Sequence, residues 1–386
     1  MIPYGRQDIN KADIDAVVNV LQSDFLTQGP QVPLFEKAVS EYCDSDYSVA
    51  VNSATSALHI ACLALDLGEG DWLWTSPNSF VASANCGLYC RARIDFVDID
   101  PQTYNLSVIE LEKKLIQAKQ ENKLPKIVIP VHFAGQSCDM KRIYFLGKKY
   151  GFKIIEDASH AIGGKYLNRP IGGCKYSDIT VFSFHPVKII TTGEGGIALT
   201  NNTELYDKMS LLRSHGITKN INNMLNDSGG PWYYEQIDLG FNYRMTDIQA
   251  ALGISQMKNL DKFVEQRHTV ACNYNESLRG LPLTLPYQDE NIFSSYHLYP
   301  ILIDLDKVNK TLEEIFDSMI NFGIGINKHY IPIYKQPFFA KFGFKKNYCR
   351  NANNYYKSSI SIPIHPLLTE KQQQKVVESL KSALEA

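Results

Sequence analysis

The sequence predicts an α/β fold: a mainly parallel, seven-stranded sheet flanked by helices, followed by a smaller α/β domain. Short β-rich runs alternate with helical patterns up to about residue 200, which is typical of a parallel sheet. Several of these runs are apolar almost throughout, as expected of strands that helices cover on both faces. The chain of 386 residues is long enough for two packed units.

The first element is an amphipathic helix that Asn10 caps. We expect its apolar stripe to turn inward, because these residues recur at helical spacing: Ile14, Val17, Val18 and Leu21. The seven β-rich runs that predict the sheet then follow at residues 47–51, 72–75, 94–99, 126–131, 152–156, 178–184 and 196–200.

The sequence after the sheet predicts a second domain. One long helical pattern begins near Thr246 and extends to about Leu278, and we expect it to bridge the two domains. Beyond it the sequence predicts a strand at 296–303, a helix at 309–321 and a terminal helix at 369–384. We therefore assign residues 1–255 to a large domain that includes the N-terminal segment, and residues 256–386 to a small C-terminal domain.

Charge and composition exclude several classes of function. The 39 basic and 41 acidic side chains give no broad positive field, so we expect no nucleic-acid partner and no membrane partner. Any anionic ligand must be bound at a local site.

The chain has neither an export signal nor an apolar stretch of membrane-spanning length. Its eight cysteines lack metal-ligand spacing, which indicates reduced, mostly buried thiols in a cytoplasmic protein and no metal site.

Lys188 lies in a turn whose surroundings favour a reactive amine. It follows the β-rich run at 178–184 and precedes a Gly-rich turn at 191–196, where a cofactor can approach the backbone. Partial desolvation in this setting lowers the pKa of a lysine and makes its amine a nucleophile toward an aldehyde. Taken alone, however, a lysine beside a strand is more often a solvated surface charge.

Two carboxylates, Glu156 and Asp157, end the apolar run at 152–156. A partly buried Asp at the carboxyl end of a strand is suited to pair with a protonated ring nitrogen. Because side chains alternate along a strand, only one of the two can point into a site. The alternatives are that Asp157 caps a helix and that His160 is a structural histidine.

Small residues at 52–59 join a strand to a helix. Free N–H groups at a helix start bind phosphate well, and the hydroxyls of Thr55 and Ser183 can add hydrogen bonds. Ordinary helix capping explains the same residues equally well. A phosphate site, a carboxylate for a ring nitrogen and a lysine that forms a Schiff base are together the requirements of pyridoxal 5'-phosphate.

The order of these features along the chain resembles that of a known enzyme family. Nine motifs follow one another: LTQGPQVPLFE, NSATSALH, SPNSFVASAN, EDASHA, FSFHPVK, TTGEGG, LRSHG, NYRMTDIQAALG and HYIPIY. With them the sequence resembles the DegT/DnrJ/StrS family of sugar aminotransferases, a branch of the fold-type I pyridoxal-phosphate-dependent transferases. NSATSAL, SFHPVK and HYIPIY resemble the subgroup of pseudaminic acid biosynthesis. This implies transfer of an amino group from glutamate to C4 of a UDP-linked 4-keto-6-deoxy-N-acetyl hexose; another nucleotide keto-sugar is the alternative.

The resemblance also implies roles for individual residues. Lys188 matches the lysine that forms the Schiff base and carries the proton, Asp157 the partner of the pyridine nitrogen, and Phe80 the ring stacked on the cofactor. The other matching cofactor-binding positions are Ala54, Thr55, Ser183, His160 and Asn242. Because Asn242 matches a residue that reaches the cofactor phosphate of the neighbouring subunit, we expect a homodimer with a shared active site.

Substrate contacts are implied in three segments. The matching residues are Tyr4, then Asp24, Phe25, Leu26 and Thr27, and finally His329, Tyr330, Ile331 and Pro332. Ordinary packing is the alternative explanation for Tyr4 and for the last segment.

Two competing functions predict different residues. A keto-sugar dehydratase of the same family typically carries histidine where this chain has Lys188, and a regulatory protein on this fold predicts a damaged cofactor site. Lys188 and Asp157 are both present, which favours an aminotransferase.

Overall fold

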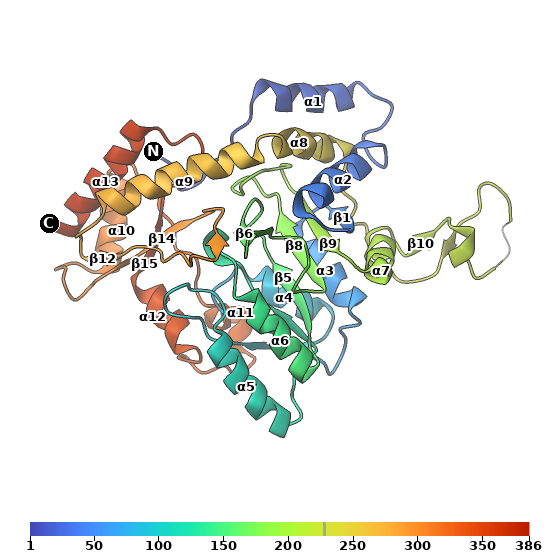
Figure 1. The fold of residues 1–386 in the computed structure, drawn as a ribbon, viewed down its shortest axis with the longest axis horizontal. Helices are drawn as coiled ribbons and strands as arrows, with labels where there is room; N and C mark the ends of the chain where they lie inside the picture. The colour runs from blue at the N-terminus through green and yellow to red at the C-terminus, as the bar shows by residue number, and fades with distance from the viewer. Residues whose placement is uncertain (227–228, 386) are drawn as a thin grey trace.

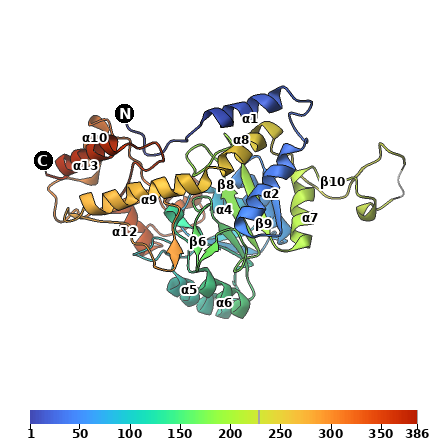
Figure 2. The ribbon, with the colours of Figure 1, turned by 45° about the horizontal axis from the view of Figure 1, so that its top comes forward.

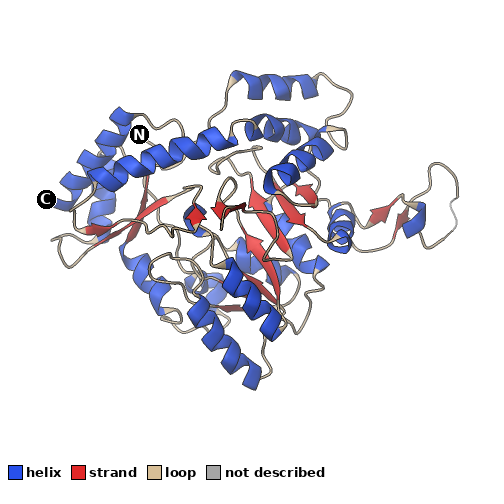
Figure 3. Cartoon of the chain, viewed as in Figure 1, coloured by secondary structure: helices blue, strands red, loops and turns tan. Residues whose placement is uncertain are grey.

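The computed structural model describes residues 1–226 and 229–385. Its centre is a seven-stranded sheet with the order β1-β9-β8-β5-β4-β2-β3, flanked by helices on both faces (Figures 1 and 3). The strands are β1 (Tyr47–Val51), β2 (Trp72–Thr75), β3 (Arg93–Phe96), β4 (Ile127–Ile129), β5 (Lys153–Asp157), β8 (Ile179–Ser183) and β9 (Gly196–Thr200). Strand β9 pairs antiparallel with β1 and β8, and the other four pairs are parallel, so the predicted mainly parallel sheet is confirmed.

Alternating strand residues pack against helices on opposite faces. Val49 and Val51 lie in one apolar cluster with helix α3, whereas Ala50 between them lies in another with helix α2. This two-sided burial explains the apolar runs in the sequence. The helices around the sheet are α2 (Gln31–Cys43), α3 (Ala54–Ala64), α4 (Ala82–Tyr89), α5 (Val108–Gln120), α6 (Met140–Tyr150) and α7 (Thr203–Arg213).

Helix α1 (Lys11–Leu21) begins as predicted but does not face inward. The Asn10 side chain accepts hydrogen bonds from the amides of Ala12 and Asp13 and forms a capping box. The expected inward stripe is wrong, because Ile14, Val18 and Leu21 are 49%, 39% and 55% exposed. Helix α1 lies outside helix α8 (Asp247–Met257), so only one side of it meets the rest of the chain (Figure 2).

The predicted long helix is two helices. Helix α8 ends at Met257, and α9 (Leu260–Ser277) begins after Lys258 and Asn259, with no side-chain cap from Asn259. An apolar pattern that runs through both helices concealed this break. Helix α9 leads from the large sheet to the C-terminal part of the chain (Figure 1).

The C-terminal part has its own sheet and core. Strands β12 (Leu283–Thr284), β14 (Tyr299–Ile303) and β15 (Ser359–Ile362) pack with α10 (Leu312–Asn321) and α13 (Glu370–Glu385) in one apolar cluster. Ile2 joins that cluster and pairs with Ile324, while Tyr355 packs into the core of the large sheet. Because these segments cross it, the domain boundary at 255/256 stays a prediction.

Shorter elements complete the fold. They are β6 (Lys165–Tyr166), β7 (Arg169–Pro170), β10 (Ile217–Thr218), β11 (Glu235–Gln236), β13 (Ile292–Phe293), α11 (Pro337–Ala340), α12 (Arg350–Ser358), and the 3-10 turns η1 (Phe133–Gly135), η2 (Ile221–Asn223) and η3 (Ile333–Lys335). All eight cysteines are free thiols and six of them are buried, as predicted. Within the described ranges, no helix is long and apolar enough to cross a membrane.

Candidate active site

Asp157 and Lys188 meet at the carboxyl edge of the large sheet. Asp157 is the last residue of β5, and Lys188 lies in the turn that follows the neighbouring strand β8. The turn is closed by backbone hydrogen bonds from Phe184 N to Gly195 O (2.9 Å) and from Thr192 N to Phe184 O (3.0 Å). Burial lowers the pKa of Lys188 to about 8, although the negative charge of Asp157 acts in the opposite direction.

Hydroxyl groups orient the Asp157 carboxylate. Ser83 Oγ donates to Asp157 Oδ2 at 2.6 Å, and Ser159 Oγ donates to Asp157 Oδ1 at 2.6 Å. Ser79 Oγ lies 2.7 Å from Ser83 Oγ. Because the Ser83 hydrogen is used on Asp157, Ser79 donates to Ser83. Ser159 N also donates to Oδ1, at 3.1 Å. Oδ2, with Ser83 as its donor, retains a lone pair for a further donor, such as a protonated ring nitrogen.

Glu156 points to the opposite face, as strand alternation requires. Its carboxylate accepts hydrogen bonds from His132 Nε2 at 2.7 Å, Ser177 Oγ at 2.5 Å and Thr180 Oγ1 at 3.1 Å. These donors hold the pKa of the buried Glu156 below its usual range, against the effect of burial. Asp157 is therefore the carboxylate that serves the site, and no helix begins at Asp157 for it to cap.

The start of α3 lies against the Gly-rich turn. Ser53 Oγ caps the helix by accepting from Ser56 N at 3.1 Å, which leaves the first-turn amides of Ala54 and Thr55 without an intrahelical acceptor. A Cβ at Gly196 would lie 2.5 Å from the carbonyl carbon of Ser53. Glycine is therefore required there so that β9 and the predicted phosphate-binding helix start can meet.

His160 is a neutral histidine with a defined tautomer. Its Nδ1 accepts from Ala134 N at 3.2 Å, so Nε2 carries the hydrogen and donates to the Tyr330 hydroxyl at 3.2 Å. Burial, together with the charge of Lys188, holds the pKa of His160 well below its usual range. The Tyr330 hydroxyl hydrogen stays available to a ligand.

The segment 329–332 reaches the site from the C-terminal part of the chain. Tyr330 N donates to Asn78 Oδ1 at 3.1 Å, and His329 Nδ1 lies 2.9 Å from Ser361 Oγ. The Tyr4 ring lies 5.3 Å from the ring of His329. Burial and the nearby Lys188 charge lower the pKa of His329 to about 3, so this ring is also neutral.

The remaining predicted residues differ in their placement. Phe80 is 60% exposed with its ring 6.5 Å from that of Tyr330, so one face stays open to a flat ligand. Ser183 is buried at the end of β8, whereas Asn242 is exposed on the single chain. Ile331 is 41% exposed, and the next residue, Pro332, is buried.

The segment of Asp24, Phe25, Leu26 and Thr27 lies beside the start of α8. All four residues are exposed. Leu26 O accepts from Asp247 N at 3.0 Å, which ties the segment to the first residue of that helix. The single chain thus leaves it free to contact a ligand or a second subunit.

Sequence reasoning missed four residues of the site: Asn78, Ser83, Ser159 and His297. Three of them lie in SPNSFVASAN and EDASHA, so the motifs contained the signal, but serine hydroxyls have too many ordinary roles to be selected by type. The His297 ring lies 4.4 Å from that of His160, and nothing in its sequence neighbourhood indicates this contact.

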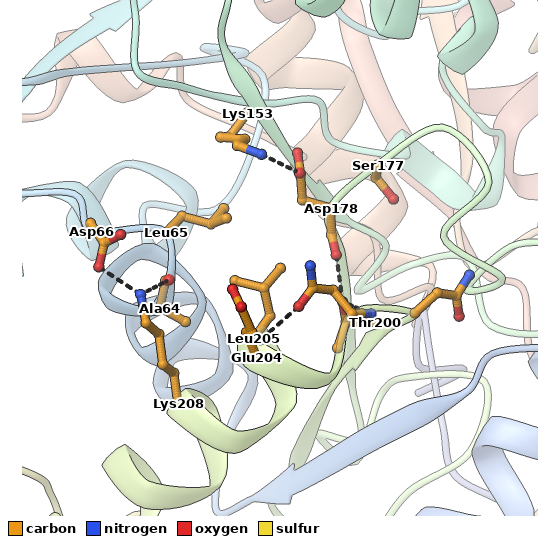
Figure 4. Close-up of a pocket in the computed structure, with 12 residues that line it drawn as sticks. Ala64, Leu65, Asp66, Lys153, Ser177, Asp178, Thr200, Glu204, Leu205 and Lys208 are labelled. Carbon is orange, nitrogen blue, oxygen red and sulfur yellow. Dashed lines mark hydrogen bonds and ion pairs between the residues drawn. The ribbon is translucent and has the colours of Figure 1, made fainter.

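A cavity of about 370 Å³ lies at the opposite, amino edge of the sheet (Figure 4). Lys153 and Lys208 line it, and each is paired with a carboxylate: Lys153 with Asp178 at 3.0 Å and Lys208 with Asp66 at 2.9 Å. The charges of both lysines are therefore neutralised within the protein. Among the described residues, no group of three His, Cys, Asp or Glu side chains is arranged to hold a metal ion.

The residues at the carboxyl edge fit pyridoxal phosphate. A partly buried lysine with a lowered pKa suits the aldehyde, the buried Asp157 suits the ring nitrogen, the exposed Phe80 suits the ring face, and the α3 amides suit the phosphate. Fold and site together define a pyridoxal-phosphate-dependent transferase.

Comparisons with known proteins agree. The DegT/DnrJ/EryC1/StrS aminotransferase family profile matches residues 7–381, and the chain belongs to this family. The chain is 40% identical to the UDP-4-amino-4,6-dideoxy-N-acetyl-beta-L-altrosamine transaminase of Campylobacter jejuni, across all of this chain and 98% of that protein.

Solved structures show the same similarity. Helicobacter pylori PseC, an aminotransferase involved in the biosynthesis of pseudoaminic acid, has a TM-score of 0.90 at 32% identity, with 99% of each chain covered. The PLP-form of the putative sugar aminotransferase Spr1654 from Streptococcus pneumoniae has a TM-score of 0.88 at 28% identity, covering 99% of this chain and 98% of that chain. The predicted family, fold class, enzyme class and cofactor are confirmed.

Proposed function

We propose that this aminotransferase moves an amino group from glutamate to C4 of a UDP-linked 4-keto-6-deoxy-N-acetyl hexose. The product would be UDP-4-amino-4,6-dideoxy-N-acetyl-β-L-altrosamine, an intermediate of pseudaminic acid biosynthesis. The observation that carries the reaction type is the partly buried amine of Lys188 beside the Asp157 carboxylate. The relatives named above support the choice of sugar.

Lys188 performs the proton transfers. When bound, pyridoxal phosphate supplies an electron-withdrawing ring that makes the proton on the carbon next to the amino nitrogen acidic. Lys188 would hold the cofactor through its aldehyde, and its Nζ would be the group that takes up and gives back the proton. A pKa of about 8 suits both directions, because the amine is neither a permanent acid nor a permanent base near neutral pH.

Asp157 and His160 hold protons in place. The Asp157 carboxylate, fixed by Ser83 and Ser159, would hold a proton on the ring nitrogen of the cofactor. His160 is neutral and its Nε2 hydrogen is directed at Tyr330, so this hydroxyl is oriented to donate toward a bound substrate. Ala54, Thr55 and Ser183 would bind the cofactor phosphate.

A homodimer with a shared active site is part of this proposal. Asn242 is exposed on the single chain, as required of a residue that reaches a partner's cofactor. The apolar side of α1 is also uncovered at Ile14 and Leu21, and Phe25 and Leu26 extend this exposed surface. A cytoplasmic location is proposed as well, because all eight cysteines are free thiols.

Reduction of the bound cofactor tests the reaction type. Purified protein should be yellow, and borohydride should fix the cofactor to a peptide that contains Lys188. The Lys188→Ala variant is the matched control, and it should bind cofactor without being labelled. A wild-type protein that stays colourless with added pyridoxal phosphate would refute the proposal.

The choice of sugar needs a separate assay. The 4-keto product of an inverting UDP-N-acetylglucosamine dehydratase should be converted with glutamate as amino donor. Activity only on the uninverted keto-sugar would reassign the enzyme to a neighbouring subgroup, and loss of water without amine formation would indicate a dehydratase.

A further inference from the structure

The positive charge of this chain is concentrated in one stretch. Residues 318–369 contain six lysines and one arginine but no aspartate or glutamate, although the whole chain has a formal net charge of −2. The stretch includes the segment 329–332 at the active site. Because the chain has no broad positive field, a charged ligand depends on a local concentration of this kind.

Two of these lysines, Lys328 and Lys335, lie at the Tyr356 ring, and two more, Lys346 and Lys357, lie close enough to Lys335 for their charges to act on it. Lys328 Nζ donates to Tyr356 O at 2.5 Å and lies 4.2 Å from the centre of the Tyr356 ring. Lys335 Nζ lies 5.7 Å from the centre of the same ring. Burial and then the positive charges of Lys357 and Lys346 lower the pKa of Lys335. We call these four residues the lysine cluster.

The lysine cluster has no acidic partner. None of the ion pairs among the described residues involves any of its four lysines, whereas Lys153 and Lys208 at the opposite edge of the sheet are each paired. Burial also lowers the pKa of Lys328 to about 8. Keeping several ammonium groups together without a counter-charge is unfavourable, and a bound anion would relieve it.

The backbone connects the lysine cluster to the active site. Lys328 directly precedes His329, and Lys335 ends η3, which begins directly after Pro332. Between them, Tyr330 contacts His160, and Ile333 N donates to Pro77 O at 3.0 Å, close to Phe80 in sequence. Two members of the lysine cluster, Lys328 and Lys335, therefore flank the segment that contacts the active site.

We propose that the lysine cluster binds the diphosphate of the nucleotide-linked sugar. Ammonium groups are effective partners of phosphate oxygens, and Lys335, Lys346 and Lys357 can adjust to a flexible diphosphate. This site is separate from the cofactor phosphate site at the start of α3. The inference rests on the proposed function only in requiring a nucleotide-linked substrate.

Binding of UDP to the cofactor-loaded enzyme tests the inference. The test variant is Lys335→Gln/Lys357→Gln, which leaves the partly buried Lys328 in place. The control is Lys371→Gln/Lys375→Gln, which removes the same charge from exposed positions on α13. Calorimetry with UDP, inorganic pyrophosphate and uridine separates recognition of the diphosphate from recognition of the nucleoside.

We expect UDP and pyrophosphate to compete for one site on the wild type and the control. The test variant should bind both at least about tenfold more weakly, since two charged hydrogen-bonding groups are lost. Its KM for the keto-sugar should rise in parallel while kcat stays within about twofold. Added salt should weaken UDP binding to the wild type more than to the test variant.

Three results would overturn the inference: equal UDP affinity in the test variant and the control, no UDP binding to the wild type, or uridine binding as tight as UDP. The proposed function is judged separately, by turnover of the UDP-linked keto-sugar in the control. Turnover with an unchanged KM in the test variant would reject the lysine cluster alone. Weakened UDP binding without turnover of that sugar would reject only the choice of sugar.

Discussion

Each edge of the large sheet carries a lysine close to an aspartate, but the two pairs behave differently. At the amino edge, Lys153 Nζ lies 3.0 Å from Asp178 Oδ1, and the lysine side chain is 55% exposed. At the carboxyl edge, Lys188 is partly buried, its pKa is lowered to about 8, and it forms no ion pair within the described ranges. An ion pair keeps an amine protonated, whereas burial without a pair leaves it reactive.

Removing the carboxyl-edge amine should have the largest effect. The Lys188→Ala variant loses both the group that holds the cofactor and the group that moves the proton. We expect kcat to fall by about 10²–10⁴-fold or more, since positioned proton transfer alone contributes that much. Single-turnover measurements with the keto-sugar check this, and a fall of less than about tenfold would mean that another residue carries the proton.

Neutralising the carboxyl-edge aspartate should have the next largest effect. Asp157→Asn keeps the size of the side chain but removes the charge that stabilises a proton on the ring nitrogen. We expect kcat to fall by about 10²-fold, with a smaller change in cofactor affinity, because the charge matters most when the proton leaves carbon. Equal losses in kcat and cofactor affinity would instead assign Asp157 to binding.

The lowered pKa of Lys188 predicts a pH dependence. In cofactor-free protein, only the neutral amine reacts with the aldehyde, so the rate of cofactor uptake should rise about tenfold per pH unit below pH 8 and level off above it. An ordinary lysine would show a rate that rises further, toward pH 10.5. Stopped-flow absorbance distinguishes the two, and a rising rate at pH 9 would show that Lys188 resembles the solvated lysines of the amino edge.

A serine hydroxyl fixes Asp157 at the carboxyl edge, whereas an ion pair and a backbone amide fix Asp178 at the amino edge. Ser83→Ala removes the donor to Asp157 Oδ2, and we expect a fall in kcat of about tenfold with little change in KM. Ser79→Ala is the matched control and should have a smaller effect, since Ser79 reaches Asp157 through Ser83. A shift in the pH dependence of the cofactor absorbance for Ser83→Ala alone would separate positioning from general destabilisation.

The sequence predicts most of the fold because local patterns are consistent with the tertiary packing. All seven β-rich runs are strands, since apolar residues such as Val49 and Ile155 are buried by helices on both faces. Two predictions about helices were wrong. Ile14 and Leu21 show the spacing of a buried stripe, but spacing does not reveal whether the covering surface belongs to the same chain. The break after Met257 also leaves the apolar pattern unchanged.

The site is predictable only where a residue type is unusual for its position. Lys188 and Asp157 stand at the ends of apolar runs, where a charged group is unusual, so the sequence indicates both. The sequence does not indicate Ser83, because a serine in a helix has many ordinary roles and its contact with Asp157 spans 74 positions along the chain. The placement of His297 beside His160 likewise depends on how the C-terminal part packs, which no local pattern contains.

Breaking the amino-edge pair should have the smallest effect. In Lys153→Gln, Asp178 keeps its hydrogen bond from Ile154 N at 2.8 Å, so β5 stays fixed and only an exposed ion pair is lost. We expect the free energy of unfolding to fall by less than about 1 kcal/mol and kcat to stay within about twofold. Urea unfolding and steady-state assays check both values. A loss of activity comparable to that of Ser83→Ala would show that charge at the amino edge reaches Asp157 through β5, and the two edges would then not be independent.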